Sequence, residues 1–276
     1  MTFLPSGSGA LVLIAFEGQD ADASEAASSL VKDLIDVWRL DDSEILDTDG
    51  FYEFRFSEPE IVRDENGRAS IAWPGIEVHR GVHEGAPITV IQGHEPGLKW
   101  REFLSLILTQ VGPEDSIVLL GGLHAEVPHT RPLPVVANTE DAGLAADLDI
   151  EVNGYAGPIG ILGLLGVESA WRGLRAINLW VGVPDYLTDS PSPKAELALA
   201  SAVERYTGVE IDIPVLEEES RAWELGADEL VELNPHLVEL LKGLEQLNDS
   251  TELPEASGDA IAAEFERYLR KRGREK

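Results

Sequence analysis

Cysteine is missing from this sequence of 276 residues. Its absence excludes disulfides, thiolate metal sites and cysteine nucleophiles, and nothing indicates an oxidising compartment. Basic residues are scarce as well, since 21 Lys and Arg stand against 51 Asp and Glu and leave a formal net charge of -30. A surface of that charge repels phosphate backbones and anionic lipid. We therefore expect neither nucleic acid nor a membrane among the partners.

Long hydrophobic runs are missing too. The longest apolar run, Ile159 to Val167, is interrupted by glycines and falls far short of the roughly 20 residues that span a bilayer. The first nine residues lack the basic flank and apolar stretch of a signal peptide. Hydrophobic residues make up 43% of the chain and charged residues 26%, as in an ordinary soluble globular protein. We expect a cytoplasmic protein with a substantial core.

Short apolar runs alternate with amphipathic segments along most of the chain. The run from Ala10 to Phe16 predicts a strand buried on both faces. Apolar residues at helical spacing from Ala27 to Trp38 predict a helix with Ser24 as its cap. The same reasoning predicts strands at 116–120 and 176–183, and helices at 100–111, 158–171 with Pro158 at its start, and 193–206. This alternation indicates an α/β protein with a largely parallel sheet covered on both faces.

Two turn signals interrupt this alternation. Asn66-Gly67 separates two short apolar runs, which is the pattern of a β-hairpin. A second hairpin is predicted to join residues 77–80 to residues 88–92 through Glu84-Gly85. We expect both hairpins to extend or flank the main sheet.

The last fifth of the chain has the pattern of helices alone. Helices are predicted at 217–225, 235–247 and 259–271, with a polar, proline-containing linker at 248–258. We therefore divide the chain into two parts. Residues 1–214 are expected to form the α/β core with its inserted hairpins, and residues 215–276 an acidic α-helical extension.

Polar side chains gather where the strand that begins at Ser116 ends. The apolar run there ends at two glycines, and the residues that follow include two histidines, a glutamate and an arginine among three prolines. Strand ends and proline-restricted loops hold side chains rigidly, as functional sites require. A further acid follows another strand in the run Gly93-His94-Glu95-Pro96 and is expected to line the same sheet edge. The candidate pocket or interface residues are Glu95, His124, Glu126, His129 and Arg131.

These residue types leave several chemistries open. His124, Glu126 and His129 would suit zinc or iron, but their spacing matches no established metal signature, so we assign no metal. His129 with Glu126 would suit acid/base chemistry, with Arg131 as an anion clamp. The sequence offers no companion nucleophile and no cofactor motif, so we assign no catalytic residue and no cofactor. A structural loop or a subunit interface remains the simpler interpretation.

Several motifs, taken in order, resemble one known family. The chain is similar to the proteasome assembly chaperone family, in particular to actinobacterial proteins grouped with the second assembly chaperone. The similarity runs from the first predicted strand to about Tyr206. Its motifs are Phe51 to Arg55 followed by Pro59, Gly93 to Pro96 with Trp100 and Phe103, Gly122 to Pro134, Gly157-Pro158 with Gly160, Leu179-Trp180, Val183-Pro184, and Ser192-Pro193-Lys194.

The resemblance implies a three-layer α/β/α sandwich like that of nucleoside phosphorylases and related hydrolases, with a helical C-terminal extension. It also implies homo-oligomers, trimers among them, and chaperoning of proteasome subunits rather than catalysis. Eukaryotic and archaeal relatives dock through a C-terminal tail that ends in a hydrophobic residue, tyrosine and one further residue. This chain ends Arg274-Glu275-Lys276, and Tyr268 is internal, so that docking mode does not carry over.

Two functions therefore remain. The first is a non-catalytic interaction protein of the assembly-chaperone type, which binds itself and proteasome subunits. The alternative is a small-molecule-binding protein, or a hydrolase-like or phosphorylase-like enzyme, with a pocket at the strand ends. The first is favoured because the sequence shows no nucleophile or cofactor motif.

Overall fold

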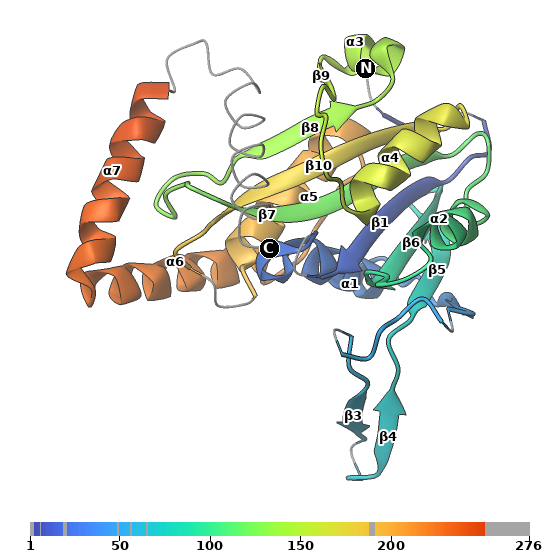
Figure 1. Cartoon of the computed structure of the whole chain (residues 1–276), viewed down its shortest axis with the longest axis horizontal. Helices are drawn as coiled ribbons and strands as arrows, with labels where there is room; N and C mark the ends of the chain where they lie inside the picture. Colours follow the sequence, from blue (N-terminus) through green and yellow to red (C-terminus); the bar gives the residue numbers. More distant parts are fainter. Residues whose placement is uncertain are drawn as a thin grey trace.

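A mixed eight-stranded sheet forms the centre of the molecule in the computed structural model, shown in Figure 1. The structure describes residues 3–251 except 6, 19, 20, 49, 56, 65 and 188–190. The strand order is β2-β5-β6-β1-β7-β10-β8-β9. The strands span β1 Leu11–Glu17, β2 Asp42–Leu46, β5 Ile76–His83, β6 Ala86–His94, β7 Ser116–Ala125, β8 Val135–Thr139, β9 Glu151–Val152 and β10 Arg175–Pro184.

The middle of the sheet is parallel, and its two sides are antiparallel where they join it. Strands β6, β1, β7 and β10 run in one direction, while β5 pairs antiparallel with β6, and β8 antiparallel with β10. A parallel strand is covered on both faces, so its sequence is a continuous apolar run. Residues 11–16 of β1 are all buried, as the sequence predicts. The edge strands are polar or short, which explains why the sequence gives them little signal.

Helices cover the two faces of the sheet. On one face lie α1 (Ala26–Val37) and α5 (Pro193–Thr207), and on the other α2 (Trp100–Leu108) and α4 (Ile161–Trp171). Alternate residues of β1 enter the two resulting cores: Leu13 packs with the α1 and α5 side, and Ile14 with the α2 and α4 side. The three-layer α/β/α sandwich is confirmed. A short helix, α3 (Ala142–Leu148), lies between β8 and β9.

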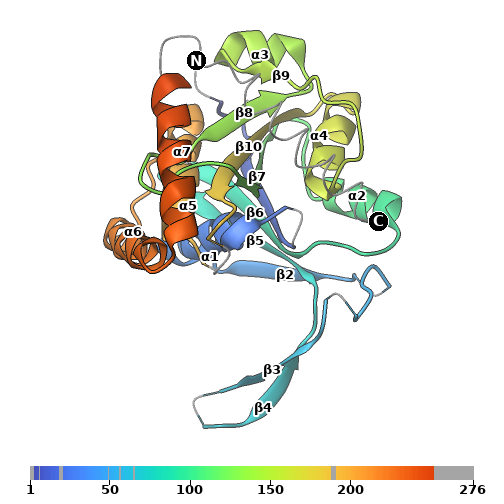
Figure 2. The same cartoon turned by 60° about the vertical axis from the view of Figure 1, so that its left-hand side comes forward.

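The two predicted hairpins both form, but only one of them is part of the main sheet. The second forms β5 and β6 in the main sheet, with Glu84 and Gly85 at positive φ angles of 50° and 86° in the turn. The first forms a separate ribbon of β3 (Glu60–Arg63) and β4 (Ala69–Ala72). This ribbon extends away from the body of the molecule in both views (Figures 1 and 2).

Two predicted helix starts are wrong. Ser24 does not cap α1, because the preceding Asp22 takes that role: its Oδ1 accepts the backbone N–H groups of Ala27 and Ser28 at 2.7 and 3.3 Å. Pro158 does not begin α4, which follows Gly160 instead. A bond from the hydroxyl of Tyr155 to the carbonyl of Pro158, 2.8 Å long, holds that segment outside the helix.

Two long helices follow the sandwich. Helix α6 (Leu216–Glu232) packs along α5, and α7 (Pro235–Thr251) turns away from its end (Figure 1). The linker predicted to begin at residue 248 is wrong at its start, because α7 continues to residue 251. The helix predicted at 259–271 lies outside the described residues, and the division of the chain at residue 215 stays a prediction. Among the residues described, no helix has the length and apolar character to cross a membrane.

Candidate functional site

The loop after β7 carries most of the polar side chains that the sequence singles out. Two tight turns shape it: Val127 donates its backbone N–H to the carbonyl of Ala125, and Arg131 donates to that of Pro128. Val127, Pro128 and His129 are all buried. The middle of the loop therefore faces the interior of the protein and not solvent.

His129 is fully buried and is bonded through both ring nitrogens. Its Nδ1 lies 2.8 Å from the hydroxyl of Tyr186, and its Nε2 lies 3.1 Å from a carboxylate oxygen of Asp228 on α6. The Tyr186 hydroxyl also accepts the backbone N–H of His129 at 2.9 Å. Burial raises the pKa of Tyr186 to about 12, so the hydroxyl keeps its proton and donates it to Nδ1. We assign the ring proton to Nε2, which then donates to Asp228.

The next two residues of the loop bind α7. Arg131 makes a two-pronged ion pair with Asp249, with Nε and Nη2 at 2.9 and 3.0 Å from the two carboxylate oxygens. Its Nη1 lies 3.2 Å from Glu245, which also accepts the hydroxyl of Thr130 at 2.6 Å. The hydrogen bonds from Arg131 lower the pKa of Asp249. The guanidinium is thus used to hold α7.

Lys194 at the start of α5 completes this contact. Its ammonium group donates to the backbone carbonyl of His129 and lies 3.0 Å from Glu224 of α6. One loop is therefore tied to α5, α6 and α7 by charged and polar side chains. We call this set the loop junction; its members are His129, Thr130, Arg131, Tyr186, Lys194, Glu224, Asp228, Glu245 and Asp249.

The other residues that the sequence nominates lie elsewhere. His124 is opposite Val183 in the sheet. Burial lowers the pKa of His124, and the charge of nearby Asp185 opposes that shift. Glu126 is exposed at the start of the loop. Neither is a member of the loop junction.

Glu95 packs between the loop after β1 and the start of α4. Its backbone N–H donates to the carbonyl of Glu17 at 2.9 Å. A methyl group added to Gly18 would come within 2.6 Å of the Glu95 carboxylate, and one added to Gly160 within 3.8 Å. The two glycines thus leave room for this acid.

A partly exposed polar cluster lies at the carboxyl ends of β1 and β6. The two carboxylate oxygens of Glu17 lie 2.8 Å from the Nζ of Lys32 and 3.3 Å from the Nε2 of His94. The hydroxyl of Tyr52 donates to the carbonyl of His94 at 3.2 Å. Burial lowers the pKa of Lys32, but its hydrogen bond with Glu17 and the negative charges of Glu17, Glu25 and Asp22 together outweigh that effect, and the net shift of the pKa is upward. Ligands of open α/β sheets commonly bind at this edge.

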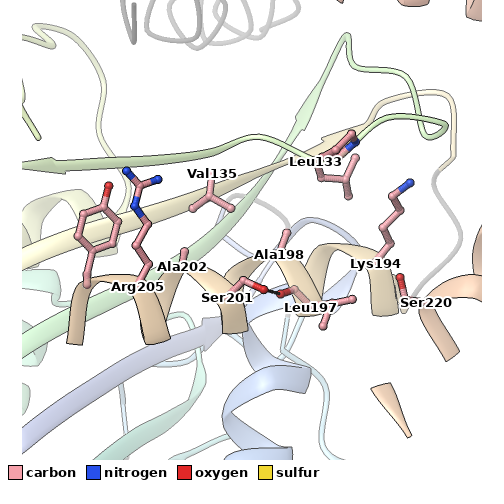
Figure 3. Close-up of a pocket in the computed structure, with 11 residues that line it drawn as sticks. Leu133, Val135, Lys194, Leu197, Ala198, Ser201, Ala202, Arg205 and Ser220 are labelled. Atoms are coloured by element: carbon pink, nitrogen blue, oxygen red, sulfur yellow. Dashed lines mark hydrogen bonds between the residues drawn. The ribbon is translucent and has the colours of Figure 1, made fainter. Parts of the chain in front are cut away.

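A shallow groove of about 400 Å³ runs along α5 beside the loop that follows β7. Figure 3 shows Leu133 and Val135 on one side of the groove, facing the side chains of α5. Lys194 lies toward one end and Arg205 toward the other, and between them lie the mostly apolar side chains of α5, with Ser201 among them. Such a groove suits an extended apolar segment more than a small polar substrate.

Sequence reasoning found one half of the loop junction and missed the other. It nominated His129 and Arg131, but it did not nominate Tyr186, Asp228 or Asp249. These partners lie 57, 99 and 118 residues farther along the chain, so no local pattern connects them to the loop. Within the described ranges, no three His, Asp or Glu side chains come together in a way that would hold a metal ion.

Comparisons with solved structures agree with this fold. A PAC2 family protein from Streptomyces avermitilis is 34% identical, and the match covers 84% of this chain and 99% of that chain with a TM-score of 0.71. A proteasome-assembly chaperone homologue from Mycobacterium tuberculosis is 29% identical over the same shares of the two chains, with a TM-score of 0.72. A second Mycobacterium tuberculosis protein, of unknown function, is 24% identical over 91% of this chain and 88% of that chain, with a TM-score of 0.75.

The family assignment rests on sequence as well as structure. No curated protein matches the chain. The sequence model of the PAC2 family matches residues 18–231, which contain every strand of the main sheet except β1, the four covering helices and nearly all of α6. The predicted membership in the assembly chaperone group is confirmed. This chain belongs to the PAC2 family.

Proposed function

We propose that this protein works by binding other proteins, as a non-catalytic assembly chaperone, and that its partners are proteasome subunits and further copies of itself. The relative from Mycobacterium tuberculosis that is 29% identical is itself described as a proteasome-assembly chaperone homologue. A binding role needs exposed surfaces that attract protein, and the chain has them.

One observation carries the proposal: large apolar side chains are exposed, while the loop side chains best suited to chemistry bind helices of their own chain. His129 and Arg131, the residues best suited to chemistry, bind α6 and α7 of their own chain. In contrast, Ile61, Ile71 and Trp73 of the projecting ribbon are 72%, 58% and 61% exposed. Exposed clusters of this kind mark protein interaction sites.

The proposal is tested by capture of partners from the source cell. The full chain, tagged and crosslinked in living cells, is purified beside the variant Ile61→Ser with Ile71→Ser and beside untagged cells. We expect proteasome α-subunits to be enriched with the unaltered chain and reduced with the ribbon variant. If neither protein recovers a proteasome subunit above the untagged background, the proteasome role is wrong.

A second candidate function is small-molecule binding at the carboxyl ends of β1 and β6. The specific observation in its favour is the partly exposed Glu17, Lys32 and His94 cluster. The probes are a panel of nucleosides with inorganic phosphate, and the measurement is the melting temperature. This function requires a rise in melting temperature that disappears in His94→Ala. The absence of any rise across the panel leaves protein binding as the proposed function.

A further inference from the structure

The projecting ribbon has one apolar face. We call β3, β4 and the flanking Phe54 and Trp73 the arm. Ile61 and Ile71 lie directly opposite each other in the ribbon, and Trp73, two residues on, shares their face. The ring of Phe54, itself 54% exposed, lies 5.6 Å from the ring of Trp73. Four large apolar side chains therefore form a continuous exposed stripe.

The arm needs a covering surface. A two-stranded ribbon alone is only marginally stable in water, and all eight residues of β3 and β4 are exposed. Among the described residues, no other element lies against the ribbon in either view (Figures 1 and 2). The charged residue on its apolar face is Arg63, two positions from Ile61. A surface that covers the arm is thus expected to be apolar and acidic.

Helix α6 offers such a surface. Its inner side is buried and packs toward the body of the molecule through four residues: Leu216, Ser220, Ala227 and Val231. A surface helix normally presents polar residues on its other side. Here Leu225 lies on that side instead and is 66% exposed, and Leu233, directly after the helix, is 83% exposed.

Acidic residues accompany these leucines. At 100° per residue, Glu218, Glu229 and Glu232 share the outer side of the helix, and all three are exposed. Arg221, the single basic residue of α6, is paired with Glu217 at 2.7 Å. We call the outer face of α6 the surface formed by Leu225, Leu233, Glu218, Glu229, Glu232 and Gly226.

Gly226 is a second indication that something covers this face. A methyl group added to it would meet nothing within 4 Å, so packing inside the described chain does not require a glycine. Glycine in a helix interior costs about 1 kcal/mol relative to alanine. A residue without a side chain at that position allows the backbone of a covering segment to approach closely.

The arm and the outer face of α6 are both apolar, and the charged residues beside their apolar side chains are opposite in sign. One is an apolar stripe with an arginine, and the other is an apolar stripe with glutamates. They stand apart on the molecule in both views, so they do not meet within one chain (Figures 1 and 2). We propose that the arm of one copy docks on the outer face of α6 of a second copy.

This inference rests on the proposed self-association and names the two surfaces that would produce it. Because different patches of the two copies meet, the contact is heterologous. Each docked copy keeps a free arm or a free α6, so successive copies close into a ring when the rotation between them permits. The alternative occupants are another protein on either surface, or a symmetrical contact of arm with arm.

Mixing two variants tests the proposal. The arm variant is Ile61→Ser with Ile71→Ser, and the face variant is Leu225→Ser with Leu233→Ser. We expect each to sediment as single chains of 30.0 kDa, while the unaltered protein sediments as an oligomer. An equimolar mixture is expected to form a species of two chains, because the intact arm of one variant meets the intact face of the other.

The controls make failure informative. Leu98→Ser with Val152→Ser removes two exposed apolar side chains elsewhere, 44% and 50% exposed, and should leave the oligomer mass unchanged. If the unaltered protein is an oligomer and the face variant keeps that mass, the docking proposal is wrong while self-association stands. If the unaltered protein is a single chain at all concentrations, both are wrong. Circular dichroism confirms that each variant is folded.

Charge exchange gives an independent check on the same pair of surfaces. Arg63→Glu places a negative charge on the arm opposite the glutamates of α6, and we expect weaker association by about tenfold. Arg63→Glu combined with Glu229→Arg is expected to regain at least part of that loss. Equal association of all three proteins would show that the arm of one copy does not face α6 of another.

Discussion

The loop junction and the arm differ in what their sequences suggest and in what their structures do. The loop junction has histidine, arginine and carboxylates, the residue types of an active site, yet its side chains bind helices of the same chain. The arm has isoleucines and tryptophan, the residue types of a core, yet it is exposed. Residue type thus indicates which interactions a segment can make. Only the position of the segment in the fold shows whether its partner is the same chain or another protein.

The comparison predicts opposite effects of substitution in the two regions. Changes in the loop junction should lower the free energy of unfolding and leave partner binding intact wherever the fold survives. Changes in the arm should leave the free energy of unfolding nearly unchanged and weaken partner binding.

The largest effect is expected at His129. His129→Ala removes two buried hydrogen bonds and leaves Tyr186 and Asp228 without their partner, which should lower the free energy of unfolding by about 3 kcal/mol. Urea denaturation measures this change. The matched control is His236→Ala, since that histidine is exposed on α7 and should tolerate the change. Equal stability of the two variants would mean that the loop junction does not hold α6.

A pH effect is expected beneath α6. Burial, together with the charge of Asp33, raises the pKa of Glu196 on α5 to about 8. Because the pKa of Glu196 is higher in the folded protein than in the unfolded chain, its contribution to the free energy of unfolding is fully present below pH 4.5. That contribution is lost as the pH rises toward 8. Glu196→Gln should therefore be more stable than the unaltered protein at pH 8, on the order of 2 kcal/mol.

Denaturation at several pH values measures this difference. Asp22, whose pKa burial raises to about 6, contributes a similar decline at lower pH in both proteins. The exposed Glu229→Gln is the control and should follow the unaltered protein at every pH. Parallel curves for Glu196→Gln and the unaltered protein would contradict a protonated Glu196.

A smaller loss is expected at Arg131. Arg131→Ala breaks the ion pairs with Asp249 and Glu245, which are partly exposed, so we expect a loss of about 1 kcal/mol. Amide hydrogen exchange should show faster opening of α7 and little change in β1. Arg221→Ala, whose ion pair with Glu217 is well exposed, should change stability by less than about 0.5 kcal/mol. Unchanged exchange in α7 would show that the ion pairs do not hold that helix.

Sequence patterns predicted most of the sandwich because its elements are regular. Continuous apolar runs such as that of β1 identify parallel strands, and Asn66-Gly67 identified the turn of the arm. The pattern missed β2, whose residues are nearly all exposed, and β8, which is short and only partly buried. Elements of that kind are determined by neighbouring strands that the local sequence does not reveal.

The sites were harder to predict than the fold. Apolar residues such as Ile61 and Ile71 read as an ordinary hairpin, and nothing in the local sequence says that the hairpin leaves the sheet. The polar loop was singled out from the sequence, and its use as a pocket or an interface stays a prediction. Its role depends on α6 and α7, whose contacts with the loop arise from tertiary packing and not from spacing in the sequence.

The smallest effect on stability, and the largest on association, is expected in the arm. Ile61→Ser with Ile71→Ser removes side chains that contact mostly solvent in a single chain, so the free energy of unfolding of that chain should change by less than about 0.5 kcal/mol. Urea denaturation at a protein concentration low enough to keep chains apart measures this. A large loss would place the arm in the folding core and reverse the comparison.

The most direct test of the account is the mass of that arm variant by sedimentation equilibrium, measured beside the unaltered protein at equal concentration. The account predicts an oligomer for the unaltered protein and a single chain of 30.0 kDa for the variant, with both folded. Equal masses for the two proteins would contradict the claim that the exposed arm is the surface through which this protein associates.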